Sequence, residues 1–168
     1  MPGGVEVSIA WSKVSGPGTV VFGDPSAPET HAAFGASCVY VLRLTASDSL
    51  ATVSDEVTVT ANLVPLVAAG ADQTVVLGEP AQLSGFADDD GLPANQLTTT
   101  WSKLAGPGTV SFGDAGALAT AASFSVEGVY TLRLTASDSA ASATDDLTIT
   151  VLKANEPPVV DAGVDQII

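Results

Sequence analysis

The chain has 168 residues, a formal net charge of −14 and only five lysine and arginine side chains, and 46% of its residues are hydrophobic. Ordinary nucleic-acid binding is excluded and anionic membranes are disfavoured, because both require clustered basic residues. No run of about 18 apolar residues could insert into a membrane, and the first residues have no basic or apolar region typical of a signal peptide.

The chain repeats itself with a period of ninety residues, the step from Trp11 to Trp101. The segment WSKVSGPGTVVFGD at Trp11–Asp24 returns as WSKLAGPGTVSFGD at Trp101–Asp114. Likewise VYVLRLTASDS at Val39–Ser49 returns as VYTLRLTASDS at Val129–Ser139. This period is longer than the 20–50 residues of solenoid repeats and is typical of one small β-domain per copy.

The alignment of the copies predicts three segments. Residues 1–61 are expected to be a truncated repeat without its first two strands, since Val5 already aligns with Asn95. Residues 62–152 are expected to be a complete repeat. Residues 153–168 are expected to be a linker and the first strand of a third repeat. We therefore expect the chain to be a slice of a longer array, because natural domain boundaries fall in linkers.

Short runs of alternating apolar and polar residues, separated by Gly, Pro and Asp, predict the strands of residues 62–152. No window shows helical periodicity, and the residues are mostly Val, Ala, Leu, Thr, Ser and Gly, a composition typical of β-sandwiches. The fold class is therefore all-β. The strands are expected at Gln73–Leu77, Ala81–Phe86, Leu97–Lys103, Thr109–Phe112, Ala119–Ser125, Val129–Ala136 and Asp146–Leu152.

Period-two alternation assigns the side chains of each strand to one face or the other. Trp101 is expected to point into the core on the face it shares with Leu97, and Tyr130 and Leu132 to point inward from the sixth strand. A Trp on the third strand and a Tyr that opens the sixth are the immunoglobulin-like arrangement. Cys38 is the one cysteine, so the usual disulfide is missing. We predict immunoglobulin-like β-sandwich repeats, one truncated and one complete.

The strongest polar cluster is Asp88, Asp89 and Asp90, between the second and third strands. In an immunoglobulin-like sandwich this connection lies at the same end as the start of the first strand and the turn between the last two strands. Asn62 and Asp138 are therefore expected beside the cluster. Oxygen atoms from separate loops suit Ca²⁺, which takes six to eight such ligands. The alternative is a solvated acidic turn in which Asp138 caps its own backbone.

No catalytic or cofactor-binding residue is predicted. His31 and Cys38 are the single histidine and cysteine, and their counterparts in the other copy are Ala121 and Gly128, so neither belongs to a shared catalytic unit. The sequence GPGT at Gly106–Thr109 lacks the Lys-Ser/Thr pair of a phosphate-binding loop and a following helix, so we expect a turn. The chain is predicted not to be an enzyme.

The residues resemble one known family. A Trp on the third strand, GVYTLRLTASDS before the last strand, and the opening NxxPxVxAGxDQTVxLG from Asn62 are similar to the PKD repeat, the immunoglobulin-like module named for polycystic kidney disease protein. WSKLAGPGTVSFGD departs from the WDFGDG signature of many PKD repeats and resembles the variant of tandem arrays related to receptor-for-egg-jelly and dyslexia-associated ectodomains. The resemblance implies an extracellular β-sandwich without activity of its own, which in some members binds calcium near its N-terminal end.

The leading hypothesis is a non-catalytic extracellular or cell-surface module that acts as a spacer, an adhesive stalk or an interaction domain for protein or carbohydrate. Its expected partners are neighbouring repeats, a protein or glycan ligand, and other copies through the incomplete terminal repeats; Ca²⁺ would stiffen the junctions. The alternative is a polysaccharide- or protein-binding accessory module of a secreted hydrolase. Sugar binding normally needs exposed aromatic side chains, and the paired aromatics of the two copies are assigned to the core.

Overall fold

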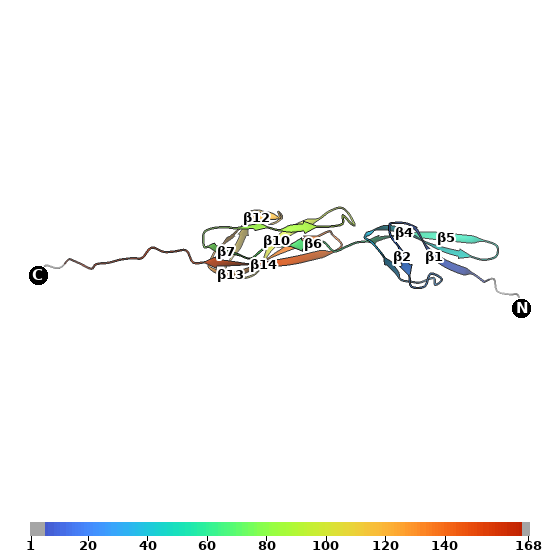
Figure 1. Ribbon diagram of the computed structural model, residues 1–168, viewed down its shortest axis with the longest axis horizontal. Coiled ribbons are helices and arrows are strands. Elements are labelled where there is room, and N and C mark those ends of the chain that lie inside the picture. Colours follow the sequence, from blue (N-terminus) through green and yellow to red (C-terminus); the bar gives the residue numbers. More distant parts are fainter. Residues whose placement is uncertain (1–5, 166–168) are drawn as a thin grey trace. The chain divides into compact units, whose positions relative to one another are not determined.

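The computed structural model describes residues 6–165, and its regular elements are all β-strands (Figure 1). Within these residues no helix has the length and apolarity needed to cross a membrane. The strands are β1 (Ser8–Ser15), β2 (Val20–Phe22), β3 (Ala32–Phe34), β4 (Cys38–Ser47), β5 (Thr52–Ala61), β6 (Leu66–Ala68), β7 (Gln73–Val76), β8 (Ala81–Ser84), β9 (Phe86–Asp88), β10 (Thr98–Ala105), β11 (Val110–Phe112), β12 (Ala119–Phe124), β13 (Gly128–Ser137) and β14 (Ser142–Leu152).

The chain divides into two compact units. The first consists of the described residues up to Val67 together with Ala87–Thr99 and Thr135–Thr144. The second consists of the remaining described segments, Ala68–Phe86, Thr100–Leu134 and the residues from Asp145 onward. All the residues predicted to bind calcium therefore belong to the first unit. We refer to residues 1–61 as the first repeat and to residues 62–152 as the second repeat.

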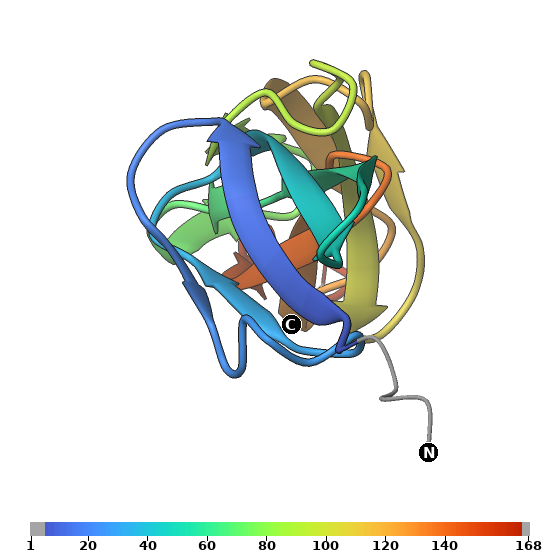
Figure 2. The ribbon, with the colours of Figure 1, turned by 90° about the vertical axis from the view of Figure 1, so that its right-hand side faces the viewer.

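The first repeat has two small sheets. Strands β1, β4 and β5 are antiparallel and hydrogen-bonded in the order β1-β4-β5, with Trp11 opposite Leu44 and Tyr40 opposite Val59. Strands β2 and β3 form an antiparallel pair (Figure 2, in shades of blue). Trp11 and Phe22, one from each sheet, have ring centroids 6.3 Å apart. The two sheets therefore face each other as the halves of a sandwich.

The second repeat has a larger version of the same two sheets. One has the order β10-β13-β14-β7 and the other the order β11-β12-β8. Strand β7 lies parallel to the end of β14, with Gln73 opposite Ile149. Strand β8 is antiparallel to β12, with Ala81 opposite Ala122. Strands β7 and β8 thus add one edge strand to each sheet.

The core of the second repeat consists of the side chains that alternation assigns inward. Trp101, Leu132, Leu134 and Ile149 are each 2% exposed or less, whereas side chains at alternate positions reach solvent. The predicted facing of these strands is therefore confirmed. Leu97 is an exception: it precedes β10 and is 36% exposed, so it does not share the buried face of Trp101.

The predicted strand Ala81–Phe86 is interrupted at Gly85, which separates β8 from β9. A Cβ atom added to Gly85 would lie 2.5 Å from the Leu134 side chain and 3.0 Å from that of Trp101. The backbone therefore approaches the core so closely that only glycine fits. After this position the chain changes partner, and β9 pairs with β6, a strand that the sequence pattern did not predict.

Each repeat anchors its core with a buried tyrosine. Tyr40 and Tyr130 are fully buried, and their hydroxyls donate to the carbonyls of Ala36 and Val126, both at 2.8 Å. This is the tyrosine corner of immunoglobulin-like sandwiches. Gly106 has a φ of +124°, and a Cβ atom there would overlap the Tyr130 ring, so glycine is required on both counts.

Candidate functional site

Asn62 and Asp138 are joined by a direct hydrogen bond. Asn62 Nδ2 donates to Asp138 Oδ2 at 2.8 Å. Asp138 Oδ1 accepts from the amides of Ala140 and Ala141 at 2.7 and 2.6 Å, so the backbone-capping turn that the sequence allows is present. Asp138 is fully buried. Its three hydrogen bonds offset the desolvation of the carboxylate.

These hydrogen bonds keep Asp138 ionised. The side-chain amide of Asn62 is the main cause that holds the pKa of this carboxyl below its usual value, and the amides of Ala141 and Ala140 act in the same direction. Burial acts in the opposite direction. The charged form prevails because every donor around the carboxylate stabilises the anion.

Asp90 binds the chain that connects the two repeats. Its Oδ2 accepts from the amide of Leu63 at 3.1 Å, and its Oδ1 accepts from the amide of Leu92 at 2.9 Å. The Leu92 amide is the main cause that lowers the pKa of Asp90; the Leu63 amide and the Ser37 side chain add to it, whereas burial and the charge of Asp138 oppose it. Asp90 therefore receives donors from its own loop, from the linker and from the first repeat.

Asp88 and Asp89 are placed differently from Asp90. Asp88 is the exposed last residue of β9. Asp89 Oδ2 accepts from the amide of Gly91 at 3.1 Å, while its Oδ1 is buried and has no hydrogen-bond partner among the described residues. The same holds for Asn62 Oδ1 within residues 6–165. Two buried oxygen acceptors at this end of the second repeat are thus unsatisfied.

The five predicted calcium ligands are brought together only in part. Among residues 6–165, no three or more Asp, Glu, His or Cys side chains are placed to share one metal ion. Both oxygens of Asp90 and of Asp138 already accept N–H hydrogen bonds. Asn62 Oδ1 and Asp89 Oδ1 are the oxygens that fit a hard cation. The observed arrangement is a hydrogen-bonded junction in which these two buried oxygens have no hydrogen-bond partner among the described residues.

Two other carboxylates tie the beginning of the second repeat to its last strand, a role that the sequence pattern did not predict. Asp145 Oδ2 accepts from the amide of Ala69 at 2.8 Å, and Asp72 Oδ1 accepts from the amide of Thr148 at 2.7 Å. Asp145 lies within β14. The recurrence of these acids as Asp55 and Asp165 was the available signal.

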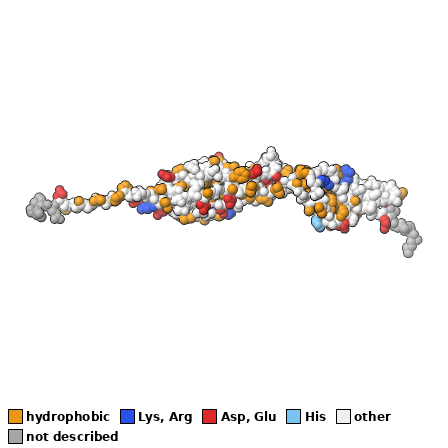
Figure 3. All heavy atoms as spheres, in the orientation of Figure 1, with side chains coloured by type: hydrophobic (Ala, Val, Ile, Leu, Met, Phe, Trp, Pro, Cys, Tyr) orange, Lys and Arg blue, Asp and Glu red, His pale blue; other side chains and the backbone are white. Residues whose placement is uncertain are grey.

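Charged side chains do not form a continuous patch on the face in view. Acidic and basic side chains there are interspersed with apolar and uncharged ones (Figure 3). Phe86 is 52% exposed and is the one exposed aromatic residue of the part that the structure describes. A single exposed ring is not the row of aromatics on which sugars stack.

Comparison with known proteins relates the second repeat to a known family. Residues 69–151 match the family model described as "K319L-like, PKD domain". This segment is a PKD-like domain. Its tyrosine corner and central Trp101 are thus features of a PKD-like, immunoglobulin-like fold.

Solved structures similar to the chain include further PKD-like and immunoglobulin-like domains. Extracellular domains 3–5 of Drosophila OTK are 16% identical, with a TM-score of 0.58 over 86% of this chain and 51% of that one. The PKD domain of human KIAA0319 is 18% identical, with a TM-score of 0.40 over 58% of this chain and 89% of that one. The PKD domain of the KIAA 1837 protein is 20% identical, with a TM-score of 0.44 over 56% and 92%. At these identities the OTK match supports the fold alone.

Proposed function

We propose that the chain is a non-catalytic extracellular or cell-surface module of a tandem array, which acts as a spacer, adhesive stalk or interaction domain. The observation that carries this proposal is the junction, where Asn62 and the Leu63 amide donate to Asp138 and Asp90. A linker held in this way has fewer conformations than a free Gly/Ser-rich linker. Restrained linkers suit a protein that keeps other domains at a distance.

The protonation states of the junction also support a structural role. The pKa values of Asp90 and Asp138 are lowered, so both carboxyls are anions at neutral pH. A general acid would need the opposite shift, towards the working pH. Their oxygens accept hydrogen bonds from backbone and side-chain N–H groups. Such hydrogen bonds hold loops in place.

The alternative function, a substrate-binding accessory module of a secreted hydrolase, has less support. Stacking on a sugar requires several exposed rings, and Phe86 alone is exposed in the described residues. Recognition of a protein substrate remains compatible with a sandwich of this kind.

The order of the linker tests the spacer proposal. In ¹⁵N relaxation experiments on the whole chain, the amide of Leu63 should have an order parameter near that of rigid backbone, about 0.85. Gly163, in the exposed segment after β14, should be more mobile. Asp90→Ala should mobilise Leu63, while the control Asp88→Ala, at an exposed position, should not. Equal mobility of Leu63 and Gly163 in the unmodified chain would contradict a restrained junction.

A more specific part of the proposal is that the junction binds Ca²⁺. Asn62 Oδ1 and Asp89 Oδ1 would supply neutral and anionic oxygens, with Asp88 and backbone carbonyls able to add further ligands. A ligand that binds only the folded state stabilises it by about 2.7 kcal/mol at a hundredfold excess over Kd. Millimolar Ca²⁺ should therefore raise the melting temperature by several degrees relative to chelator.

Two variants decide whether this effect is specific. Asp89→Ala should abolish the calorimetric heat of Ca²⁺ binding, because it removes the unpartnered buried carboxylate oxygen. Asp161→Ala makes the same chemical change in the exposed segment after β14 and should leave the heat unaltered. If neither melting nor calorimetry responds to Ca²⁺ in the unmodified chain, the junction works through hydrogen bonds alone.

A further inference from the structure

The first repeat contains an Asp-Pro peptide bond, Asp24–Pro25, in the connection between β2 and β3. Asp24 Oδ1 accepts hydrogen bonds from the amide and the hydroxyl of Ser26, at 2.9 and 2.6 Å. The ring that the hydrogen bond to the amide closes contains the Asp24–Pro25 bond itself. The carboxylate is therefore held alongside this peptide bond.

Three further hydrogen bonds hold the two residues of this bond in place. The amide of Asp24 donates to Thr30 Oγ1 at 2.9 Å, and the Pro25 carbonyl accepts from the amide of Trp11 at 2.8 Å. The Asp24 carbonyl accepts from the amide of Ala27 at 3.4 Å. A nucleophile that breaks the peptide bond must attack this last carbonyl. An N–H group that faces its oxygen stabilises the negative charge that develops there.

The single histidine of the chain lies against the residue before this bond. A Cβ atom added to Gly23 would overlap the ring of His31 at Cε1, Nε2 and Nδ1, so the imidazole packs on the Gly23 backbone. The Gly23 amide donates to the His31 carbonyl at 3.0 Å, which keeps the two segments side by side. Histidine is a common proton donor near neutral pH, either directly or through one water molecule.

The second repeat has the same turn without the proline and the histidine. Asp114 closes it: Oδ1 of this residue accepts from the amide two residues later at 2.8 Å. The positions of Pro25 and His31 are occupied by Ala115 and Ala121. The turn therefore forms without either side chain, so the fold does not require them.

We propose that the first repeat cleaves its own Asp24–Pro25 bond. An oxygen of the Asp24 carboxylate attacks the carbonyl carbon of the same residue and closes a five-membered cyclic anhydride. The C–N bond to Pro25 breaks as its nitrogen takes a proton from the imidazolium of His31, directly or through one water molecule. Water then opens the anhydride to two carboxylates and releases two protons. One proton returns to His31, and the other converts the new Pro25 amine to an ammonium group.

The residue types at this bond match the needs of the reaction. An X-Pro bond is a tertiary amide, whose nitrogen is protonated more readily than that of an ordinary peptide bond and therefore leaves more easily. The nucleophile must be an anion. The Ser26 hydroxyl is the main cause that lowers the pKa of Asp24, and the Ser26 amide acts in the same direction, whereas burial opposes both. Asp24 is therefore a carboxylate at neutral and mildly acidic pH.

The cut leaves the two fragments paired. Strands β1 and β2 precede Asp24, whereas their partner strands β4 and β3 follow it. Residues 1–24 thus remain attached through strand pairing alone, and they separate on denaturation. Each chain reacts once, so the reaction is self-processing and not enzymatic turnover. It does not depend on the proposed role as a spacer.

Intact mass spectrometry of the purified full chain under denaturing conditions tests this proposal. During several days at about pH 6, where histidine is largely protonated, the chain should give two products, residues 1–24 and residues 25–168. The Asp114–Ala115 bond provides a control in the same sample and should stay intact. A chain that remains whole, or equal cleavage of the two bonds, would overturn the proposal.

Two variants and an unfolded sample test the assigned roles. Pro25→Ala should abolish cleavage, and His31→Ala should slow it by about a hundredfold, because a positioned proton donor contributes roughly 10²–10⁴ in rate. Both changes introduce the residue that the second repeat has at that position, so the turn should be retained. Unfolding in urea should also slow the reaction, since His31 then leaves Gly23. Cleavage that is equally fast in His31→Ala or in urea would be ordinary acid hydrolysis of an Asp-Pro bond, and the proposal would be wrong.

Hydroxylamine identifies the intermediate. It opens a cyclic anhydride to a hydroxamate, so the fragment of residues 1–24 should carry a hydroxamate when the chain is cleaved in its presence. A contaminating protease that hydrolyses the bond with water leaves only a carboxylate. Absence of the hydroxamate would therefore contradict attack by Asp24.

Discussion

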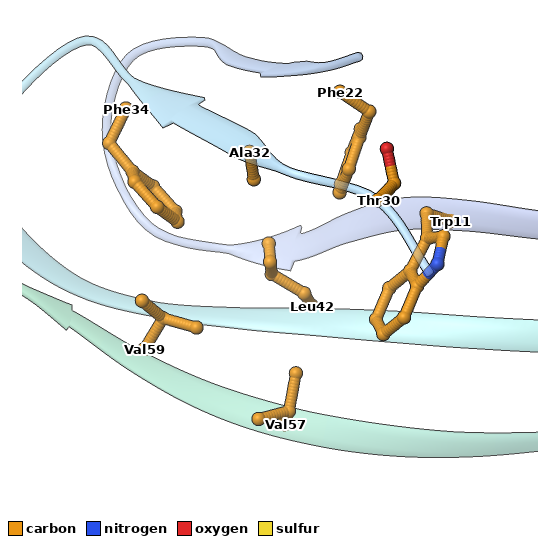
Figure 4. A pocket seen from close by; sticks show the side chains of 8 residues that line it. All are labelled: Trp11, Phe22, Thr30, Ala32, Phe34, Leu42, Val57 and Val59. Carbon is orange, nitrogen blue, oxygen red and sulfur yellow. The ribbon is translucent and has the colours of Figure 1, made fainter. Parts of the chain in front are cut away.

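The two repeats contain nearly the same lining residues but bury them to different degrees. Trp101 is 2% exposed, while its counterpart Trp11 is half-buried and lines an open groove of about 280 Å³ between the two sheets of the first repeat (Figure 4). Strand β12 has six residues, while its counterpart β3 has three. Because β8 pairs with β12 and nothing described pairs with the outer edge of β3, the covering strand extends the sheet as well as the core. Tyr40 and Leu42 are buried in the first repeat as well, but Trp101 and Leu147 become fully buried only where both sheets have their edge strands.

Features that depend on neighbours in sequence are the same in both repeats. Three features are present in both repeats. They are the tyrosine corner, the turn closed by Asp48 or Asp138, and the ion pair that joins β4 to β5 or β13 to β14. Features that require β7 and β8 are present once. The comparison therefore separates local stabilisation from long-range stabilisation within a single chain.

The largest expected effect is the loss of Trp101. Trp101→Ala should destabilise the second repeat by about 3–5 kcal/mol, because it removes a buried aromatic and leaves a cavity. Trp11→Ala should cost clearly less, since Trp11 already borders a groove of about 280 Å³. Urea denaturation followed by NMR signals of each repeat measures both effects. Equal losses would show that the groove is closed in solution.

Removal of the covering side chain should make the second repeat more like the first. Leu83 is 2% exposed on β8, and Leu83→Ala should cost about 2–5 kcal/mol. Gln82 lies on the same strand with its side chain exposed, and Gln82→Ala should change stability by no more than about 0.5 kcal/mol. If the two variants are equally stable, β8 contributes through backbone pairing and not through its side chains.

Acid should distinguish the two equivalent turns. The pKa of Asp138 is lowered by Asn62 and by backbone amides, and that of Asp48 by the amides of Leu50 and Ala51. A carboxyl with a lowered folded-state pKa stabilises the fold fully above the unfolded value, near 3.8, and loses this contribution as the pH falls through the folded value. Asp138→Asn should remove more of the acid-induced loss of stability than Asp48→Asn. The comparison is made from melting temperatures between pH 7 and pH 2.

The smallest effects are expected from the ion pairs. Arg133 binds both oxygens of Asp146 at 2.7 and 2.8 Å, whereas Arg43 binds one oxygen of Glu56 at 2.9 and 2.6 Å. All four side chains are partly exposed, so solvent screens both pairs. Arg133→Ala and Arg43→Ala should each change the urea midpoint only slightly, and less so at high salt. A large loss at either position would indicate that packing of the arginine stem matters more than its charge.

Much of the second repeat could be predicted from its sequence. The period-two alternation of Leu132 and Leu134 placed both in the core, since a strand has only two faces. The approach of Asn62 and Asp90 to Asp138 could be predicted in outline from the topology of an immunoglobulin-like sandwich. The N–H groups that donate to each carboxylate could not be predicted. They are the backbone amides of Leu63, Leu92 and Ala141, and their directions depend on backbone angles.

The sequence by itself determined the ninety-residue repeat, the all-β class and the inward faces of the strands, because these follow from local alternation and from comparison of the two copies. Tertiary structure alone decided that Gly85 divides a predicted strand, that Asp72 and Asp145 tie the beginning of the second repeat to its last strand, and that the lining of the first repeat remains an open groove. Each of these depends on which distant segment lies opposite. An alternation pattern specifies which face a side chain takes, but only the partner strand determines whether that face is covered.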